Sequence, residues 1–524
     1  MKVFSDIRKN TYFDSVALMI ISRELKEMPG ISEALAGMAT ELNKELLTNL
    51  GLMSPEIDAL GANDFFVSVK ADSEGSFDAV NKKLAELLQN KVKDEAGDYR
   101  PPGLAAAVRH LPKANIAIVS LPGRHAAAEV EKALDENLHV MLFSDNVSLS
   151  DEVRLKKKAH EKGLFMMGPD CGTAIINGVA LCFANVVRRG RIGVVGASGT
   201  GIQELTTLID KLGGGISHAL GTGGRDLKAE VGGIMMLDAI DVLSRDANTD
   251  VLVIISKPPA KEIAAKMFDK LQNVKKKTVV HFLGGSAQHN GYAGYSGKSL
   301  EDTARKAVLL EAGKEPKEDF TGFTAPLDEI ERLAAGEAGK LRAGQKYLRG
   351  LYSGGTLAYE ALLELKAEGI DCYSNIPLTA EYKLQDSFAS KQNTVIDFGE
   401  DEFTVGKPHP MIDASSRQEA ILKEAGDPEV AIILLDIVTG YGASGNIVGE
   451  MIDAVKKARV KLTAENRHIA FIGFICGTEG DKQGLSKSEA ALRENGVVVL
   501  PSNAQAARFA YKLLAAKKGG GKNE

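Results

Sequence analysis

Short runs of β-branched and other apolar residues alternate along nearly the whole chain with longer stretches in which apolar residues recur every three or four positions. The short runs predict strands and the longer stretches predict amphipathic helices. Residues 115–119 and 251–255 are typical of the first pattern, and 152–162 of the second. Because regular strand–helix alternation is typical of βαβ units, the chain is predicted to be an α/β protein with several Rossmann-type or flavodoxin-like, doubly wound parallel sheets.

Breaks in this rhythm divide the chain. Before residue 95, helix-like stretches near 14–27, 41–50 and 76–89 follow strand-like runs, which predicts three further βα units with parallel strands. At 524 residues, the chain exceeds one core and needs several domains. The predicted segments are an N-terminal α/β domain (1–100), a partial Rossmann-type domain (101–186), a first flavodoxin-like domain (187–320), a linker (321–345), a second flavodoxin-like domain (346–512) and a mobile tail (513–524).

The two flavodoxin-like segments open in the same way. A strand leads into Ser-Gly-Thr or Ser-Gly-Gly-Thr, and a helix with an early glutamate follows, Glu204 in one and Glu360 in the other. This similarity predicts an internal duplication. A glycine-rich turn before a helix directs backbone N–H groups at an anion, although the same residues also serve as ordinary turns and helix caps. The predicted phosphate- or substrate-binding residues are Ser198, Gly199, Thr200, Gly201, Ser353, Gly354, Gly355 and Thr356.

Two further loops combine charge with a position after a strand. Arg225 lies in the loop 221–227, and Lys407 and His409 lie in the loop 403–410. Arg225 could fork onto a carboxylate or phosphate, Lys407 could supply a point charge, and His409, held between two prolines, could handle a proton. The alternative for Arg225 and Lys407 is a solvated turn with surface ion pairs, and for His409 it is a rigid turn. Ligands of doubly wound sheets bind at the carboxyl ends of strands, where we expect these loops.

Composition excludes several classes of protein. The net charge of -6 argues against a dedicated nucleic-acid binder. Four scattered cysteines fit a reducing cytoplasm without a disulfide framework, and no metal-spaced His and carboxylate cluster appears, so no metal is predicted. No leader-like start and no membrane-length apolar run is present, so we expect a soluble cytoplasmic protein. Walker A and G-x-G-x-x-G motifs are absent.

Several longer strings resemble a known family. They lie at 143–147, 167–173, 196–205, 223–227 and 405–413, and the chain resembles the FdrA family of acyl-CoA-synthetase-like proteins over essentially its whole length. Residues 113–312 are also similar to the α-subunit of succinyl-CoA synthetase. The resemblance implies the fold of that superfamily. It also implies that the loop Gly168-Pro169-Asp170-Cys171, which is similar to the GPNCPG loop of that subunit, contacts a cofactor.

The chain departs from the ligases of this superfamily. Gly291-Tyr292-Ala293-Gly294 stands where they have the G-H-A-G of the phosphorylated histidine, and Lys257 lies in the run that replaces their supporting glutamate. A phenol with a pKa of about 10 does not replace imidazole as a phosphoryl carrier. His289 is the one nearby substitute. The first half of the CoA-binding domain and the ATP-grasp domain are not recognisable, so no cofactor is predicted and CoA is kept only as an alternative.

The resemblance implies a function in anaerobic allantoin and purine breakdown. FdrA-like proteins are associated there with two companion subunits encoded nearby, which together resemble an oxamate carbamoyltransferase. The implied partners are carbamoyl phosphate, a small carboxylate or amide such as oxamate, and those subunits in an oligomer, with no nucleic acid and no membrane. The alternatives are an NDP-forming acyl-CoA synthetase with phosphate on His289 or on a partner, and a non-catalytic structural subunit.

Overall fold

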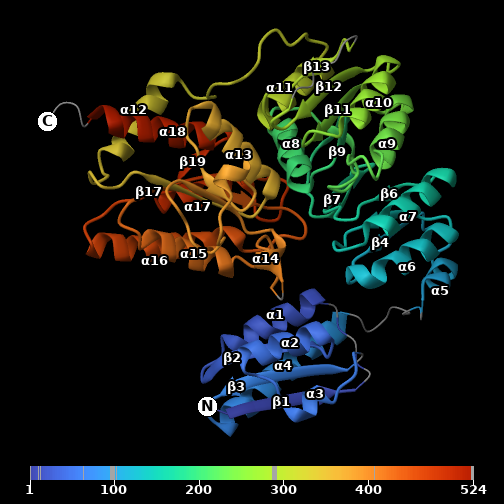
Figure 1. Ribbon diagram of the computed structural model, residues 1–524, viewed down its shortest axis with the longest axis vertical. Helices are drawn as coiled ribbons and strands as arrows, with labels where there is room; N and C mark the ends of the chain where they lie inside the picture. Colours follow the sequence, from blue (N-terminus) through green and yellow to red (C-terminus); the bar gives the residue numbers. More distant parts are fainter. Residues whose placement is uncertain are drawn as a thin grey trace. The chain divides into compact units, whose positions relative to one another are not determined.

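The chain forms two compact units in a computed structural model (Figure 1). The structure describes residues 2–520 apart from 10, 12, 14, 63, 95–100, 102, 286–291 and 406. The first unit comprises residues 1–101 with 401–408, and the second comprises 102–400 with 409–524. Each unit is described by itself below.

The first unit is a three-stranded antiparallel sheet with helices. β3 lies between β1 and β2 and is antiparallel to both. Phe65, Val67 and Val69 of β3 pack into one apolar cluster, while Phe66 packs into another, as the period-two alternation of a strand requires. The elements are β1 (Lys2–Arg8), α1 (Ser15–Lys26), β2 (Ile31–Met38), α2 (Glu41–Leu50), α3 (Pro55–Asp58), β3 (Phe65–Ala71), α4 (Glu74–Asp94) and α14 (Asp401–Thr404).

This sheet corrects the prediction of neighbouring parallel strands before residue 95. The predicted helices exist as α1, α2 and α4, but β3 inserts between β1 and β2. β1 and β2 are therefore parallel to each other without being hydrogen-bonded, which is a split βαβ arrangement. Strand order depends on contacts across the sheet, and the βα rhythm alone does not specify it.

The second unit begins with a small parallel sheet. The strand order is β4-β5-β6, and α6 and α7 pack beside each other. Val130, Leu134 and Leu155 of these helices bury against Val140 and Leu142 of β5. The elements are α5 (Leu104–His110), β4 (Ile116–Val119), α6 (Gly123–Asp135), β5 (His139–Leu142), α7 (Leu149–Glu161) and β6 (Met166–Met167).

Two larger sheets follow and share one strand order. The first runs β13-β12-β11-β9-β10 with the hairpin β7-β8 at its edge, and the second runs β15-β16-β14-β17-β18-β19. In both, the opening strand (β9 or β14) lies between its next two principal strands, and these pairs are parallel. This is the flavodoxin-like order, and it confirms the predicted α/β fold class with parallel sheets.

The elements of the first large sheet are β7 (Thr173–Ile176), β8 (Val179–Cys182), β9 (Arg189–Gly196), α8 (Gly199–Lys211), β10 (Ile216–Gly221), α9 (Ile234–Arg245), β11 (Val251–Ser256), α10 (Lys261–Gln272), β12 (Lys277–Phe282), β13 (Tyr295–Ser296), α11 (Leu300–Glu311) and α12 (Leu327–Ala338). Those of the second are β14 (Tyr347–Tyr352), α13 (Gly355–Ala367), β15 (Tyr373–Ser374), the 3₁₀ turn Ala380–Tyr382, β16 (Thr394–Asp397), α15 (Ser415–Ala425), β17 (Val430–Val438), α16 (Ile447–Ala464), β18 (Ala470–Cys476), α17 (Leu485–Glu494), β19 (Val498–Leu500) and α18 (Asn503–Gly520).

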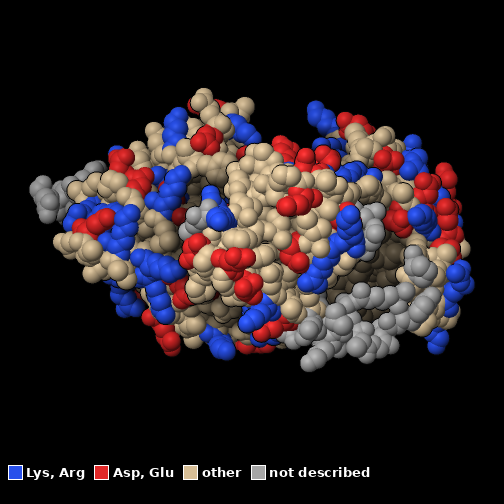
Figure 2. Space-filling model, turned by 90° about the horizontal axis from the view of Figure 1, so that it is seen from below, with Lys and Arg blue, Asp and Glu red and all other residues tan. Residues whose placement is uncertain are grey.

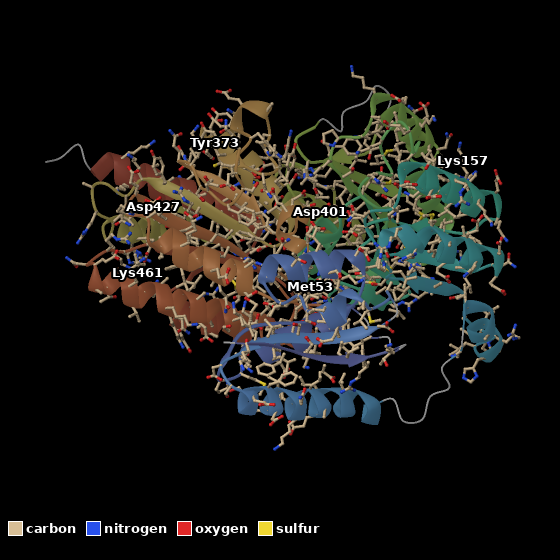
Figure 3. All side chains as sticks on the ribbon, turned by 60° about the horizontal axis from the view of Figure 1, so that its bottom comes forward. Met53, Lys157, Tyr373, Asp401, Asp427 and Lys461 are labelled. Atoms are coloured by element: carbon tan, nitrogen blue, oxygen red, sulfur yellow. The ribbon has the colours of Figure 1, made fainter. Side chains whose placement is uncertain are left out.

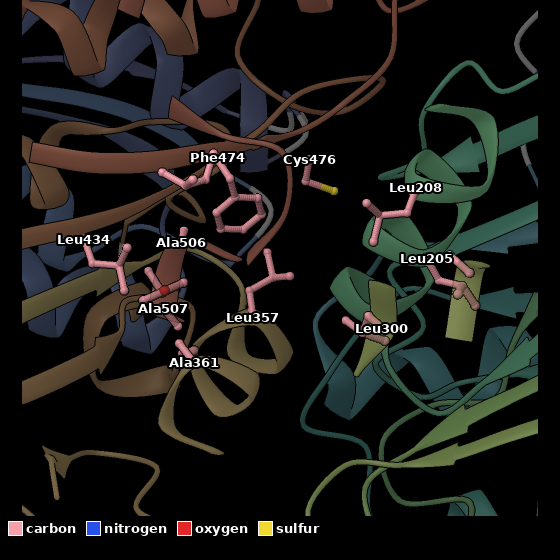
Figure 4. Packing of buried hydrophobic residues seen from close by; sticks show 14 of the residues in the cluster. Leu205, Leu208, Leu300, Leu357, Ala361, Leu434, Phe474, Cys476, Ala506 and Ala507 are labelled. Carbon is pink, nitrogen blue, oxygen red and sulfur yellow. The ribbon is translucent and has the colours of Figure 1, made fainter. Parts of the chain in front are cut away.

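One apolar cluster joins the two flavodoxin-like halves. Leu205 and Leu208 of α8 and Leu357 of α13 belong to it together with Phe474 and Cys476 of β18. Figure 4 shows these side chains on the facing elements of the two halves. Burial of this shared surface is the main term that holds the halves together, because apolar area removed from water contributes about 25 cal/mol per Å².

Two segments predicted to lie outside the domains are packed against the core instead. The stretch 321–345, predicted as a linker, contains α12, whose Ile330, Ala334 and Ala338 are buried against the rest of the cluster. The tail predicted to be mobile from 513 continues α18 to Gly520, with Leu513 and Leu514 buried. Glycine, alanine and charged residues alternate in the first stretch, and lysines and glycines make up half of the second, so the few buried apolar side chains that fix them did not stand out.

Polar contacts also fix the second half. Arg349 of β14 is buried and pairs with Glu424 at 2.6 Å and with Asp427 at 2.8 Å. Asp427 is labelled in Figure 3.

On the face in Figure 2, acidic and basic side chains are interspersed among uncharged ones, so this face offers no single-sign surface to a polyanion.

Candidate functional site

The two glycine-rich helix starts, predicted separately, lie against each other within the second unit. Ser198 follows β9 and caps α8 by accepting from the Gly201 N–H at 3.0 Å, and its hydroxyl hydrogen-bonds to the Thr356 hydroxyl at the start of α13. A Cβ built on Gly354 would lie only 2.9 Å from Cγ2 of Thr200. The amino ends of α8 and α13 therefore abut.

Backbone donors at these helix starts remain available. The N–H groups of Gly199, Thr200, Gly355 and Thr356 make no hydrogen bond within the part of the chain that the structure describes. Each helix start also carries roughly half a positive charge from its dipole. Two such ends at one place favour a phosphate or carboxylate.

One part of the predicted anion cradle is filled by the protein itself. The carboxylate of Asp436 on β17 accepts from the Ser353 N–H at 2.8 Å, the Ser353 hydroxyl at 3.0 Å and the Gly354 N–H at 2.9 Å. Asp436 is fully buried and pairs with the equally buried Arg417 at 2.7 Å. Ser353 and Gly354 therefore do not offer these donors to a ligand, which corrects their predicted role, while Gly355 and Thr356 keep theirs.

A second acid and an imidazole border the same helix start. A Cβ built on Gly355 would lie 2.4 Å from Oδ2 of Asp397, and one built on Gly399 would lie 3.0 Å from both Asp397 Oδ1 and His409 Nε2. Burial raises the pKa of Asp397 to about 7. Burial, together with the charge of Arg417, lowers the pKa of His409 to about 4. The pair thus offers a neutral imidazole and a carboxyl that titrates near neutral pH.

The tautomer of His409 follows from its backbone contact. Nδ1 accepts the N–H of Met411 at 3.3 Å, so the ring proton of the neutral imidazole lies on Nε2. The ring also packs on Phe183, with centroids 5.6 Å apart. His409 was predicted as a proton handler, and its Nε2 faces Gly399, as Oδ1 of Asp397 does.

Lys257 is a site residue that sequence reasoning missed. It follows β11, where it was read only as part of the run replacing a glutamate, and its ammonium lies over the ring of Tyr359 of α13 at 4.9 Å. Its charge also acts to lower the pKa of Asp397. Its place directly after a strand next to β9 is the signal that could have found it.

Arg225 makes protein contacts that its predicted role did not include. Its guanidinium forms an ion pair with the buried Glu152 at 2.9 Å and donates to the carbonyl of Val147 at 2.8 Å. Glu152 also pairs with the buried Lys156, which binds Asp226 at 2.6 Å. These contacts tie α7 to the loop after β10. An anion contact by Arg225 stays a prediction.

The loop Gly168-Pro169-Asp170-Cys171 packs against that same loop. A Cβ on Gly223 would lie 2.3 Å from the carbonyl oxygen of Pro169, and Gly168 N–H donates to Thr222 at 3.3 Å. Cys171 is buried, which raises the pKa of its thiol to about 12, whereas Asp170 is exposed. These contacts assign the loop a packing role, and its cofactor contact stays a prediction.

The remaining predicted positions lie elsewhere. Lys407 belongs to the first unit and is not among the residues that the second unit brings together. His289 and Gly291 lie outside the described residues. Tyr292, which the resemblance aligns with the ligase histidine, shares a hydrogen bond with the Thr278 hydroxyl at 2.9 Å and packs half-buried against an apolar cluster, and desolvation raises its pKa to about 12. A phenol held there is unsuited to carry phosphate.

Three family models match parts of the chain. The model described as CoA-ligase matches residues 351–513, the one described as CoA binding domain matches 187–284, and the one described as AllF, heavy metal-associated domain matches 1–101. The CoA-binding match lies on the first flavodoxin-like half, whereas the sequence had indicated 101–186 for the CoA-binding-like part.

Full-length similarity decides the family. The chain is 42% identical over 515 residues, 98% of its length and 99% of the relative's, to the uncharacterized protein YahF of Escherichia coli (strain K12). The chain belongs to the YahF family. The scaffold of this family is that of the acyl-CoA synthetases and succinyl-CoA ligases. The α-subunit 1 of the ADP-forming succinate–CoA ligase of Archaeoglobus fulgidus, for example, is 27% identical over 212 residues, which are 38% of this chain and 70% of that protein.

Among solved structures, the dinucleotide-forming acetyl-coenzyme A synthetase 1 of Ca. Korarchaeum cryptofilum in the apo form is similar with a TM-score of 0.29 at 16% identity, covering 77% of this chain and 83% of that one. ATP citrate lyase from Methanothrix soehngenii has a TM-score of 0.33 at 12% identity, covering 80% and 85%.

The heavy-metal-associated model that matches residues 1–101 raises the question of a metal in this member of the YahF family. Soft metals bind thiolate and imidazole, and residues 1–101 contain neither cysteine nor histidine. Among the described residues no group of His, Cys, Asp and Glu is arranged to hold a metal ion. The N-terminal segment therefore lacks the thiolate and imidazole ligands that hold most heavy metals. None of the described helices is long and apolar enough to cross a membrane.

Proposed function

We propose that the paired starts of α8 and α13 bind the phosphate of an acyl phosphate, and that the chain is a subunit of a carbamoyltransferase converting oxamate and carbamoyl phosphate to oxalurate and phosphate. The observation that carries this proposal is the set of free amides on Gly199, Thr200, Gly355 and Thr356. Lys257 adds a cation over the Tyr359 ring of α13, and its charge reaches Asp397. Such a site fits an anion that leaves during the reaction.

The reaction needs positioning and one proton transfer. The amide nitrogen of oxamate attacks the carbonyl carbon of carbamoyl phosphate, a C–N bond forms, and the C–O bond to phosphate breaks. The nitrogen loses one proton. In our proposal Asp397 takes up that proton in its ionised form, with His409 Nε2–H donating a hydrogen bond beside it. No covalent protein intermediate is required.

The test uses Gly355→Ala, which places a methyl group 2.4 Å from Oδ2 of Asp397 and so displaces the carboxyl or the helix start. We expect phosphate release from carbamoyl phosphate plus oxamate to fall by about 100-fold, the range seen when oriented donors are lost. Gly336→Ala, in α12 with nothing within 4 Å of the added methyl, is the matched control. Activity unchanged by Gly355→Ala would remove the helix starts from the reaction.

The companion subunits and the oligomer belong to the same proposal. Assaying the purified chain with and without co-expressed companions shows where activity resides. If Gly355→Ala leaves the activity of the complete complex intact while the companions alone are active, the chain is a structural subunit.

An NDP-forming acyl-CoA synthetase is the second candidate, favoured by the matches to CoA-ligase and CoA-binding models. It needs a phosphohistidine, for which His289 is the nearby candidate in the sequence. Incubation with ATP, CoA and a carboxylic acid, followed by mass spectrometry for phosphohistidine, distinguishes the two. A phosphorylated imidazole formed during turnover would favour the synthetase.

A further inference from the structure

A cavity of about 660 Å³ lies in the second unit, away from the paired helix starts. Its lining includes Asn115 before β4, His139 at the start of β5 and Asp246 after α9, together with residues of β6, β7, β8 and β10, and none of the residues at the starts of α8 and α13. The starts of α8 and α13 follow the carboxyl ends of β9 and β14. The cavity is thus separate from the candidate site, and its size is typical of small-molecule sites.

Most of the wall is apolar. Met167, Leu220 and Leu243 are almost completely buried beneath it, and Phe165 and Val242 border it. Such a lining favours a ligand with an apolar or aromatic body, because burial of that body contributes most of the binding free energy.

Two histidines on the wall have their tautomers fixed by the backbone. Nδ1 of His139 accepts the N–H of Phe165 at 3.0 Å, and Nδ1 of His218 accepts the N–H of Asn177 at 3.2 Å. Burial lowers the pKa of both imidazoles. In the neutral ring the proton is therefore on Nε2.

The two Nε2–H groups differ in their surroundings. That of His218 lies 3.6 Å from a carboxylate oxygen of Asp246, whereas that of His139 has no partner among the described residues. The wall thus presents a free donor at His139, and a hydrogen-bond acceptor on a ligand would satisfy it.

The charged residues around the cavity disfavour an anionic ligand. No lysine or arginine of the described residues lines the cavity, while Asp246 does. Arg189, whose charge acts on His218, donates to the carbonyl of Asn177 at 3.0 Å. An anion would therefore lose its hydration without gaining a cation.

We propose that this cavity binds an uncharged small molecule with an aromatic or branched apolar body and a carbonyl-type acceptor, which His139 Nε2–H engages. The proposal does not depend on the reaction at the helix starts. A ligand held away from the starts of α8 and α13 would act as an effector or as a separately held substrate.

The test compares three probes of similar size by ligand-observed NMR titration: benzamide, benzoate and toluene. We expect saturable binding of benzamide. Toluene should bind about fivefold or more weakly because it lacks the hydrogen bond, and benzoate about fivefold or more weakly because its charge loses hydration without gaining a cation. Binding of benzoate as tight as that of benzamide overturns the assignment of a neutral ligand.

Two variants locate the binding. Val242→Trp fills the cavity from a side chain that is 42% exposed, so the core is not disturbed, and should abolish benzamide binding; Val460→Trp, at a 73% exposed position of α16, is the matched control. His139→Asn keeps an acceptor for Phe165 N–H but loses Nε2–H, so benzamide should fall to the affinity of toluene while toluene is unchanged.

Benzamide binding retained by Val242→Trp overturns the proposal, and so does a change in oligomeric state of that variant, which would place a second copy of the chain on the cavity. Equal melting temperatures of the two tryptophan variants confirm that the fold is intact. Failure of the Gly355→Ala test leaves this proposal untouched, because the two sites share no residue.

Discussion

Two aspartates at the start of α13 have different roles because their partners differ. Asp436 accepts from Ser353 and Gly354 and pairs with Arg417, and these contacts oppose the burial that raises its pKa. Asp397 has one backbone donor, Gly399 at 2.8 Å, and burial raises its pKa to about 7. One acid therefore organises the loop, and the other is available for proton transfer.

At this scale, the Arg417–Asp436 pair yields a stability prediction. Arg417→Met leaves the buried Asp436 carboxylate without its counter-ion, so we expect the free energy of unfolding to fall by about 3–5 kcal/mol. Urea unfolding at neutral pH measures it. Lys366→Met breaks the exposed pair with Asp371 and should lower the free energy of unfolding far less. Equal losses for both variants would contradict the role of the buried pair.

Helices α8 and α13 are joined by more than their amino ends. Asn503 at the start of α18 donates its side-chain N–H to Glu360 at 2.8 Å and its backbone N–H to Glu204 at 3.3 Å. Leu300 N–H donates to the other oxygen of Glu360 at 2.7 Å. Burial raises the pKa of Glu204 to about 7 and that of Glu360 to about 8.

These pKa values predict how stability depends on pH. Both carboxyls hold protons in the folded protein at pH values where the unfolded chain has lost them. Their contribution is complete below pH about 4, the unfolded pKa, and is lost as pH rises through 7 to 8. Glu360→Gln removes one such group. The free energy of unfolding of this variant minus that of the wild type should therefore be higher at pH 8.5 than at pH 5, by on the order of 3 kcal/mol.

Urea unfolding at pH 5 and pH 8.5 checks this difference. The exposed Glu381→Gln controls for the loss of one acidic side chain. A Glu360→Gln variant whose stability relative to the wild type is the same at both pH values would show that Glu360 is not held protonated.

On the scale of the whole molecule, the first unit has its own core. Leu25, Phe65 and Val80 form an apolar cluster with neighbours from α1, α4 and the sheet, all within residues 1–101. A unit with such a core is able to fold alone. Its match to a heavy-metal-associated model does not extend to ligands, since residues 1–101 have no cysteine or histidine.

We therefore expect the isolated fragment 1–101 to unfold cooperatively on heating, with a melting temperature unaffected by Zn²⁺ or EDTA. Circular dichroism measures both. A rise in melting temperature with Zn²⁺ would indicate that other side chains bind the metal and would contradict the prediction that this fragment binds none. The fragment 102–524, which holds all four cysteines, is the comparison for nonspecific thiol binding.

The sequence by itself determined the features that depend on neighbours along the chain. Apolar periodicity predicted most helices and strands, and the repeated Ser-Gly-(Gly)-Thr turn predicted two matching flavodoxin-like halves, because strand-to-helix turns need specific local residues. The sheets of the two halves share the strand order that this duplication requires.

Tertiary structure alone decided which groups meet. Asp436 reaches Ser353 across 83 residues, Ser198 meets Thr356 across 158, and Arg225 finds Glu152 on another element. β3 likewise inserts between two strands that precede it. Such contacts come from the packing of sheets and helices onto each other, which places distant residues together without leaving a periodic trace in the sequence.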